Sequence, residues 1–166
     1  MRKVLAVLII AGILVLALTM PALAARPAMV IGSAGSYSEY QGSRITTIAA
    51  WALPRGGATG LVRVDRTGDA AGWVTAVHVR DLAVEGDYAY LMGVVTRDTR
   101  RPELVGSWAY LVVYDGSTVG GVDVVSHFWI LGEAEIRVLF EAHSLLEELG
   151  AIFWMPVTSG GYRLLP

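Results

Sequence analysis

Residues 73–97, WVTAVHVRDLAVEGDYAYLMGVVTR, decide the fold class, because two apolar runs meet there at one short turn. Val, Thr, Tyr and Trp dominate both runs, and these residue types favour β-strands. Glu85-Gly86-Asp87 separates the runs and supplies residues that tolerate the positive φ of a tight turn. The stretch therefore predicts two antiparallel strands, over 73–84 and 88–97.

The first of these strands changes phase in its middle. Alternate residues from Trp73 to Val79 form one apolar set, whereas Leu82 and Val84 follow the opposite parity. One extra residue at Arg80-Asp81, as in a β-bulge, would return both sets to the same face of the sheet. We therefore expect a bulge at this point.

The alternation of apolar run and glycine-containing turn continues along the chain, which is typical of an all-β domain. The expected strands cover 45–53, 60–66, 73–84, 88–97, 106–114, 122–131 and 135–141, and residues 152–158 and 162–165 are expected to form a closing hairpin. The predicted fold is mainly β: an antiparallel meander of about eight strands that closes into a small barrel or a two-layer sandwich.

One interruption of the strand pattern is helical. Ser144 and Glu147 fit a capping box, and Gly150 stands where a C-terminal cap is expected, so we predict a short helix over 145–149. In a competing interpretation the helix begins near Glu133, because apolar residues from there onward also recur at helical spacing. We favour a strand followed by the short helix.

The first 24 residues form a leader. Arg2 and Lys3 give a positive start, residues 4–18 are apolar apart from Gly12, and Ala22-Leu23-Ala24 has small residues at the −3 and −1 positions of a cleavage site. The apolar run is shorter than the roughly 20 residues that a bilayer-spanning helix needs. We expect a cleaved signal peptide over 1–24 and a secreted, periplasmic or cell-surface protein, with an uncleaved N-terminal anchor as the alternative.

Composition narrows the class of protein. The 166 residues contain 13 Lys and Arg, 15 Asp and Glu and no cysteine, and 54% are hydrophobic. Lack of cysteine excludes a lipoprotein anchor, a disulfide scaffold and a thiolate zinc site. A formal charge of −2 argues against a nucleic-acid binder, which needs a basic face. After the leader we expect a loose segment over 25–43 and one β domain over 44–166, with no further membrane span.

Pairing registers indicate which residues of the central strands share a face. A loop centred near Arg101 places Met92 opposite Tyr110, and a loop centred near Thr118 places Trp108 opposite Phe128. Because side chains alternate along a strand, the bulky residues then share one face, which we assign to the interior. These residues are Tyr88, Tyr90, Met92, Trp108, Tyr110, Val112 and Phe128. A slip of one residue would exchange the two faces.

The aromatic face supplies the candidate ligand-binding residues: Tyr88, Tyr90, Trp108 and Tyr110. Aromatic rings offer a large contact area at little entropic cost, and barrels of about eight strands enclose small ligands. Filling an ordinary β core is the alternative role for the same rings.

The histidines and serines offer weaker candidates. His78, His127 and His143 lack the spacing of a helical zinc site. Ser126 and His127 are neighbours on one strand, so they point to opposite faces and do not form a nucleophile–base pair. We predict no catalytic residue, no metal and no cofactor.

Two groups of charged residues remain. Asp115 and Asp123 flank a glycine-rich connection and offer oxygen ligands for Ca²⁺, but an Asp that begins a turn more commonly bonds its own backbone. Arg97, Arg100 and Arg101 form a small basic cluster that we interpret as a solvated loop.

Several turn-and-strand stretches give a resemblance over residues 60–126. They are Val84-Glu85-Gly86-Asp87-Tyr88-Ala89, Gly93-Val94-Val95, Val112-Val113-Tyr114-Asp115-Gly116 and Asp123-Val124-Val125-Ser126. In this order they resemble a secreted bacterial β-rich domain type with no established activity. The resemblance implies a signal-bearing meander of β-strands and lends no site residue. The chain beyond Leu131 departs from it.

These observations favour a non-catalytic protein. We expect an extracytoplasmic structural or binding module, whose partner is another extracytoplasmic protein. The alternative is a barrel-type carrier of a small apolar ligand, which predicts an enclosed cavity lined by the aromatic residues. A hydrolase using acidic residues is a lesser alternative, since it needs two titratable groups in one cleft.

Overall fold

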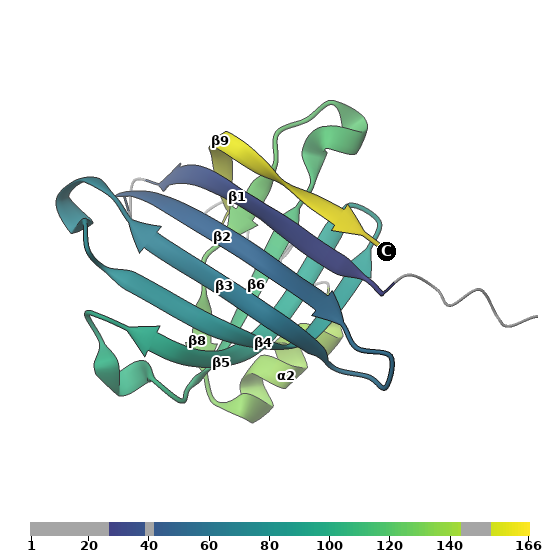
Figure 1. The fold of residues 1–166 in the computed structure, drawn as a ribbon, viewed down its shortest axis with the longest axis horizontal. Coiled ribbons are helices and arrows are strands. Elements are labelled where there is room, and N and C mark those ends of the chain that lie inside the picture. The colour runs from purple at the N-terminus through teal and green to yellow at the C-terminus, as the bar shows by residue number, and fades with distance from the viewer. Residues whose placement is uncertain (1–26, 39–41, 144–153) are drawn as a thin grey trace, which may run out of the picture.

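The computed structural model describes residues 27–38, 42–143 and 154–166, which form a closed antiparallel β-barrel with helix α2 on its outside (Figure 1). The strands of the barrel are β1 (Met29–Ser38), β2 (Gly42–Ala52), β3 (Ala58–Arg66), β4 (Val74–Glu85), β5 (Tyr88–Asp98), β6 (Trp108–Tyr114), β7 (Val124–Ser126) and β9 (Trp154–Leu165). An extra strand, β8 (Trp129–Leu131), pairs with β6, and α2 covers Glu133–Ala142.

Sequential strands pair from β1 to β7, and β9 closes the ring between β7 and β1. The predicted fold class, an antiparallel β domain with a short helix, is confirmed, and of its two architectures the barrel is the one observed. Within the described ranges, three 3₁₀ segments connect strands: η1 (Gly68–Ala70), η2 (Pro102–Leu104) and η3 (Gly116–Val119).

The segment expected to be loose, residues 25–43, contains strand β1, so this expectation is wrong. Val30, Ala34 and Ser36 are buried along it, and it pairs with both β2 and β9. Its glycine and serine content concealed the strand, although Gly32 has a packing reason. A Cβ on Gly32 would lie 2.8 Å from Tyr162 Cα, so glycine permits the close approach of β9.

Residues 133–142 form helix α2, and the strand expected over 135–141 is wrong. The Gly132 amide donates to Glu135 Oε2 at 2.9 Å, and Ile136 N donates to Gly132 O at 3.1 Å, which starts the helix. Ile136 is fully buried and Leu139 and Phe140 pack beside it, so the helical period outweighs β propensity here. The helix expected over 145–149 lies outside the described residues.

The closing hairpin is also wrong, because residues 154–165 form one strand, β9. Its first part pairs with β7 and its later part with β1, with a register shift opposite Gly35/Ser36. The Ser159-Gly160-Gly161 stretch, expected to turn the chain, continues the strand instead. Gly160 has φ +75° there and stands opposite Ala34.

Two detailed predictions for β4 and β5 are confirmed. Val79 pairs with Gly93 and Asp81 pairs with Met92, so Arg80 is the extra residue of a bulge. Met92 lies opposite Tyr110 and Val94 opposite Trp108, as the register predicts.

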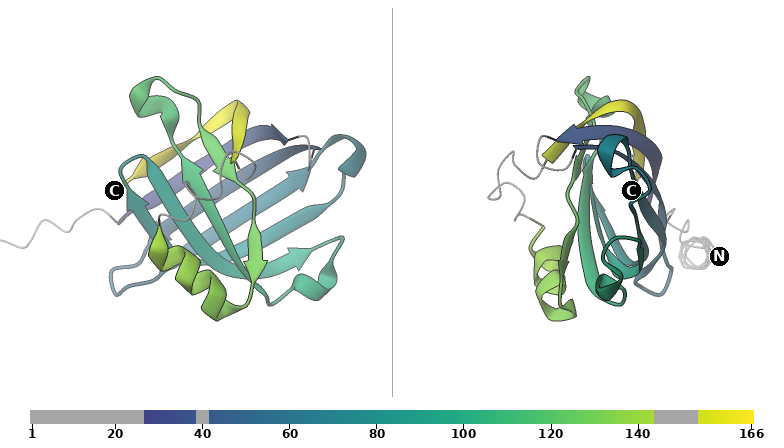
Figure 2. Two further views of the ribbon diagram at one scale, coloured as in Figure 1. Left: turned by 180° about the vertical axis from the view of Figure 1, so that it is seen from behind. Right: turned by 90° about the vertical axis from the view of Figure 1, so that its left-hand side faces the viewer.

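The faces of β5 and β6 are the reverse of those expected. Small and medium apolar side chains fill the barrel, including Ala89, Leu91, Val95, Ala109, Leu111 and Val113. The aromatic face points outward and forms a second, smaller core with α2. Figure 2 (left) shows this helix lying against the outside of the barrel. Both faces of these strands are thus buried, so the hydrophobic pattern of the sequence does not distinguish the inward face from the outward one.

Phe128 departs from the expected register. Tyr114 pairs with Val124, but Tyr110 pairs with Trp129, so the pairing shifts where β7 ends and β8 begins. As a result Phe128 packs against the barrel core and not with Trp108.

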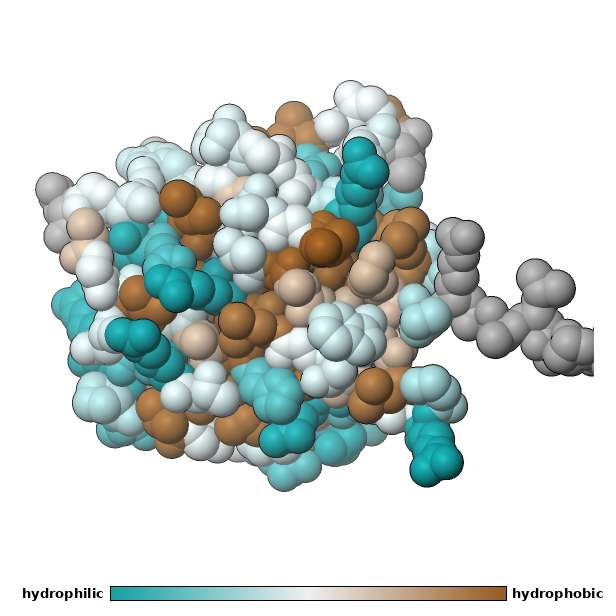
Figure 3. Space-filling view, viewed as in Figure 1, coloured by the Kyte–Doolittle hydropathy of each residue, from teal (hydrophilic) through white to brown (hydrophobic). Residues whose placement is uncertain are grey.

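The outer faces of β1, β2 and β3 are not covered by other described elements (Figures 1 and 3). Apolar side chains lie among hydrophilic ones on this surface, and Ile31, Ile45, Trp51 and Leu61 are more than 40% exposed. In the described part of the chain, no helix is long and apolar enough to span a bilayer.

Candidate functional site

The structure brings the four predicted ligand-binding residues together, but outside the barrel. Tyr90 and Tyr110 are buried beneath α2, and Tyr88 and Trp108 are partly buried at its margin. The Tyr90 ring stacks on the His143 imidazole at 4.4 Å between centroids. The expectation that these rings line the barrel interior is wrong.

Tyr88 also borders a shallow hollow of about 190 Å³ with Tyr114, Val124 and Trp154. The Tyr88 and Tyr114 rings are 4.9 Å apart, and the Trp154 ring meets Tyr88 edge-on at 6.5 Å. None of the described residues that line this hollow is charged.

The three histidines lie in different parts of the fold. His78 on β4 is 3.4 Å from Thr59 Oγ1, His127 is buried between β7 and β8, and His143 ends α2 and contacts Glu85 at 2.9 Å. Among the residues that the structure describes, no group of three His, Cys, Asp or Glu side chains has a metal-binding arrangement.

The side chains of Asp115 and Asp123 both accept hydrogen bonds from backbone amides of the turn between them. Asp115 Oδ1 accepts from Ser117 N at 3.0 Å, which is the backbone bond predicted for an Asp that begins a turn. Asp123 accepts from Gly116 N at 3.0 Å and from Tyr162 N at 2.8 Å. Both Asp123 oxygens therefore hold the η3 loop and β9 in place.

A cavity of about 450 Å³ opens at one end of the barrel, where β2 begins and β3 ends. The connections after β3 and after β5 lie at this same end (Figure 1, left). The cavity is lined by Arg44, Val64, Arg66, Ala70, Trp73, Thr75, Arg100, Arg101, Phe128 and Ile130. Four of these ten residues are arginines.

Strand register places the first two arginines. Inward-facing residues alternate along β2 and β3, so Ile48 pairs with Val62 and Thr46 with Val64 within the barrel. The next inward pair is Arg44 with Arg66. Like charges directly opposite one another destabilise a sheet, so this pair is an unusual way to end a barrel core.

Arg44 is the more deeply buried of the two, at 2% exposure. Its Nη2 donates to Ser126 O at 2.6 Å, across the barrel on β7, and its buried Nε has no acceptor among the described residues. No carboxylate of the described residues lies within ion-pair distance of Arg44. Burial first, and then the Arg66 charge, lowers the pKa of Arg44 to about 9, so the guanidinium is charged at neutral pH.

The ring of Trp73 contacts the three other arginines at the rim of the cavity. The guanidinium carbons of Arg66 and Arg100 each lie 4.9 Å from the centre of its ring, and that of Arg101 lies 5.2 Å away. Such cation–π contacts hold flexible arginine side chains in place. Arg100 and Arg101 therefore line the cavity and contact Trp73, so the interpretation of the basic cluster as a solvated loop does not hold for these two residues. Arg97 does not line the cavity.

Asp98 fixes Trp73 and the following turn. Its Oδ1 accepts from Trp73 Nε1 at 3.0 Å and from Arg101 N at 2.8 Å, and its Oδ2 accepts from Thr75 Oγ1 at 2.9 Å. Burial acts to raise the pKa of the Asp98 carboxyl, but these hydrogen bonds outweigh it, so the pKa lies below its usual value. The carboxylate is thus committed to positioning the rim.

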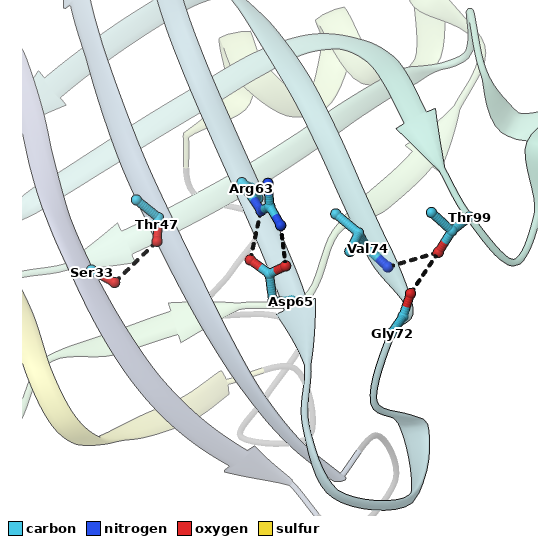
Figure 4. A network of polar contacts seen from close by, with 7 residues as sticks. All are labelled: Ser33, Thr47, Arg63, Asp65, Gly72, Val74 and Thr99. Atoms are coloured by element: carbon cyan, nitrogen blue, oxygen red, sulfur yellow. Dashed lines mark hydrogen bonds and ion pairs between the residues drawn. The ribbon is translucent and has the colours of Figure 1, made fainter.

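Thr99 fixes the backbone on both sides of Trp73. Its Oγ1 accepts from Val74 N at 2.9 Å and donates to Gly72 O at 3.1 Å (Figure 4). Figure 4 also shows Arg63, which pairs with Asp65 at 2.6 Å on the outer face of β3. Arg63 and Arg66 of β3 thus point to different sides of the sheet: Arg63 lies on the outer face with Asp65, and Arg66 lines the cavity.

His127 lies next to the cationic cavity. Burial first, followed by the charges of Arg44 and Arg66, lowers its pKa to about 4. At neutral pH the imidazole is therefore uncharged and adds nothing to the local positive charge.

Together these groups present four guanidiniums around a cavity that also has apolar lining residues, and the carboxylate of Asp98 beside it pairs with Arg101 at 3.7 Å. Guanidinium groups bind carboxylate and phosphate oxygens in bidentate geometry, and burial strengthens this attraction. The arrangement is therefore chemically suited to bind an anion.

Two patterns in the sequence bear on this site: the basic cluster that includes Arg100 and Arg101, and the parity of Arg44 and Arg66 within their strands. Arg44 shares the parity of Ile48 and Ala50, and Arg66 shares that of Val62 and Val64. Arg44 precedes the strand expected over 45–53 and Arg66 is the last residue of the strand expected over 60–66, so the strand pattern did not predict that either side chain faces inward. Comparison of the chain with family models, with curated proteins and with solved structures finds no match.

Proposed function

We propose that the protein is an exported, non-catalytic binding module that holds a small anionic ligand in the cavity at the barrel mouth. The leader pattern of residues 1–24 supports export. The observation that carries the proposal is Arg44: a buried guanidinium that faces the cavity without a carboxylate partner among the described residues.

A buried charge without a counter-charge is costly, and a bound anion would supply the missing partner. Three further guanidiniums at the rim would attract the anion and contact it on entry. The packed barrel core argues for a site at the mouth and not deep within the barrel.

Thermal unfolding of the purified protein in sodium phosphate and in sodium chloride of equal ionic strength tests the proposal. A ligand that binds only the folded state raises the melting temperature, and occupancy at 100 times Kd adds about 2.7 kcal/mol. We expect phosphate to raise the melting temperature above the chloride value in the wild type but not in Arg44→Met.

Arg63→Met is the control, because it removes one positive charge from the outer face of β3, away from the cavity. It should retain the response to phosphate. An equal response in Arg44→Met and Arg63→Met would contradict the proposal, since it would reflect general screening of charge.

A further inference from the structure

The cavity has two chemically different walls. Arg66 from β3 and Arg100 and Arg101 from the connection after β5 surround Trp73 and form a cationic wall. Phe128 and Ile130, beside and within β8, give the same cavity an apolar wall.

Three guanidinium groups already lie around the Trp73 ring. An aromatic or sugar ligand would have to displace them before it could stack on the indole. The tryptophan therefore acts through the arginines that it holds, and the cationic wall recognises charged oxygen atoms.

The apolar wall offers contact that a bare inorganic anion cannot use. Phe128 and Ile130 are partly exposed, although both pack on the barrel core beneath them. Val64, which is buried, extends the apolar surface toward the base of the cavity. A ligand with an apolar body would cover this surface while its charged group meets the arginines.

Building on the proposed function, we propose that the ligand is an amphipathic organic anion. Its carboxylate or phosphate group contacts Arg44 and the rim arginines, and an apolar body attached to that group packs on Phe128 and Ile130. The volume of about 450 Å³ is within the range of small-molecule sites, so a short apolar body fits.

Calorimetric titration with matched pairs of anions tests the ligand class. We compare acetate with hexanoate and inorganic phosphate with phenyl phosphate, at constant pH and ionic strength. We expect hexanoate and phenyl phosphate each to bind at least tenfold more tightly than their small counterparts. Dodecanoate, used below its micellar concentration, then distinguishes two classes of ligand. Tighter binding of dodecanoate than of hexanoate indicates a lipid acid, and weaker binding indicates a short organic acid.

A wall variant separates the apolar contact from the charge. Ile130→Thr leaves every arginine in place, and it should reduce the advantage of hexanoate over acetate at least threefold. Ile45→Thr, on the exposed outer face of β2, should leave that advantage unchanged.

The two proposals fail in different ways. Equal affinity for phosphate and phenyl phosphate, and for acetate and hexanoate, would overturn the amphipathic ligand but leave an anion site. Absence of binding by all these anions would overturn the anion site itself.

Discussion

Arg44 on β2 and Arg66 on β3 are direct cross-strand partners, and both side chains line the cavity at the same end of the barrel. Two inward guanidiniums in this position oppose folding, because like charges on facing residues repel. Proteins keep such arrangements where function requires them, and stability is then lower than the fold allows. The pair thus links the register of the sheet to the proposed binding of an anion.

Replacement of Arg44 by methionine should therefore stabilise the protein when no anion is bound. The substitution removes a buried charge that costs several kcal/mol, and it forfeits one hydrogen bond to Ser126 O, worth about 1–3 kcal/mol. We expect the free energy of unfolding in low-salt, anion-poor buffer to rise by about 1 kcal/mol, measured by urea denaturation. A fall of similar size would show instead that the guanidinium is a structural link between β2 and β7.

The second core beneath α2 gives a prediction with an internal control. Ile136 is fully buried between the helix and the outer face of β5 and β6, whereas Val138 on the same helix is 63% exposed. Ile136→Ala should lower the free energy of unfolding by about 3 kcal/mol, because it leaves a cavity. Val138→Ala should change it by less than about 0.5 kcal/mol. Equal effects in chemical denaturation would mean that α2 does not pack as described.

The features of the fold that depend on neighbouring strands are the ones that the sequence predicted best. The β4 bulge at Arg80 and the pairing of Met92 with Tyr110 follow from parity and turn position, which are local properties. The choice of interior face failed because Ala89 and Tyr90 are both buried, one inside the barrel and the other under α2. Only the position of the helix distinguishes them, and that is a tertiary property.

The site was less predictable than the fold. Arg44 and Arg101 lie 57 positions apart in the chain and meet only because the barrel closes. The sequence shows Arg101 in a charged loop and Arg44 at the edge of a strand, and each has an ordinary explanation there. Barrel closure and the contacts of Trp73 give them a common role.

Close packing at the β4 bulge requires glycine at position 93. A Cβ there would lie 2.8 Å from His78 C and 2.9 Å from Val79 Cα, and nearer still to His78 O. Gly93→Ala should therefore destabilise the fold by about 3 kcal/mol. At Gly121 the nearest atom would be 3.5 Å away, so Gly121→Ala is the control and should be within about 0.5 kcal/mol of wild type. Urea denaturation would contradict this packing if both variants matched the wild type.

Acid should destabilise the ligand-free protein through His127. Its pKa is about 4 in the folded state against about 6.5 when unfolded, so the unfolded state binds more protons between these values. The free energy of unfolding then falls as the pH drops from 6.5 toward 4, by at most about 1.4 kcal/mol per pH unit from this group. His127→Gln should flatten this slope in denaturation curves recorded at pH 7, 6 and 5. An unchanged slope in His127→Gln would show that other groups control it.

Binding of an anion should partly reverse the lowering of the His127 pKa. After burial, the charges of Arg44 and Arg66 are the causes that lower the pKa of His127, and a bound carboxylate or phosphate would offset them. In NMR titrations we expect saturating phenyl phosphate to raise the pKa of His127 well above its ligand-free value. His78 and His143 provide controls in the same spectra, since neither lines the cavity. Because linkage is reciprocal, affinity for the anion should increase as the pH falls through the same range. A His127 pKa that stays constant while the anion binds would place the anion away from Arg44, against the site proposed here.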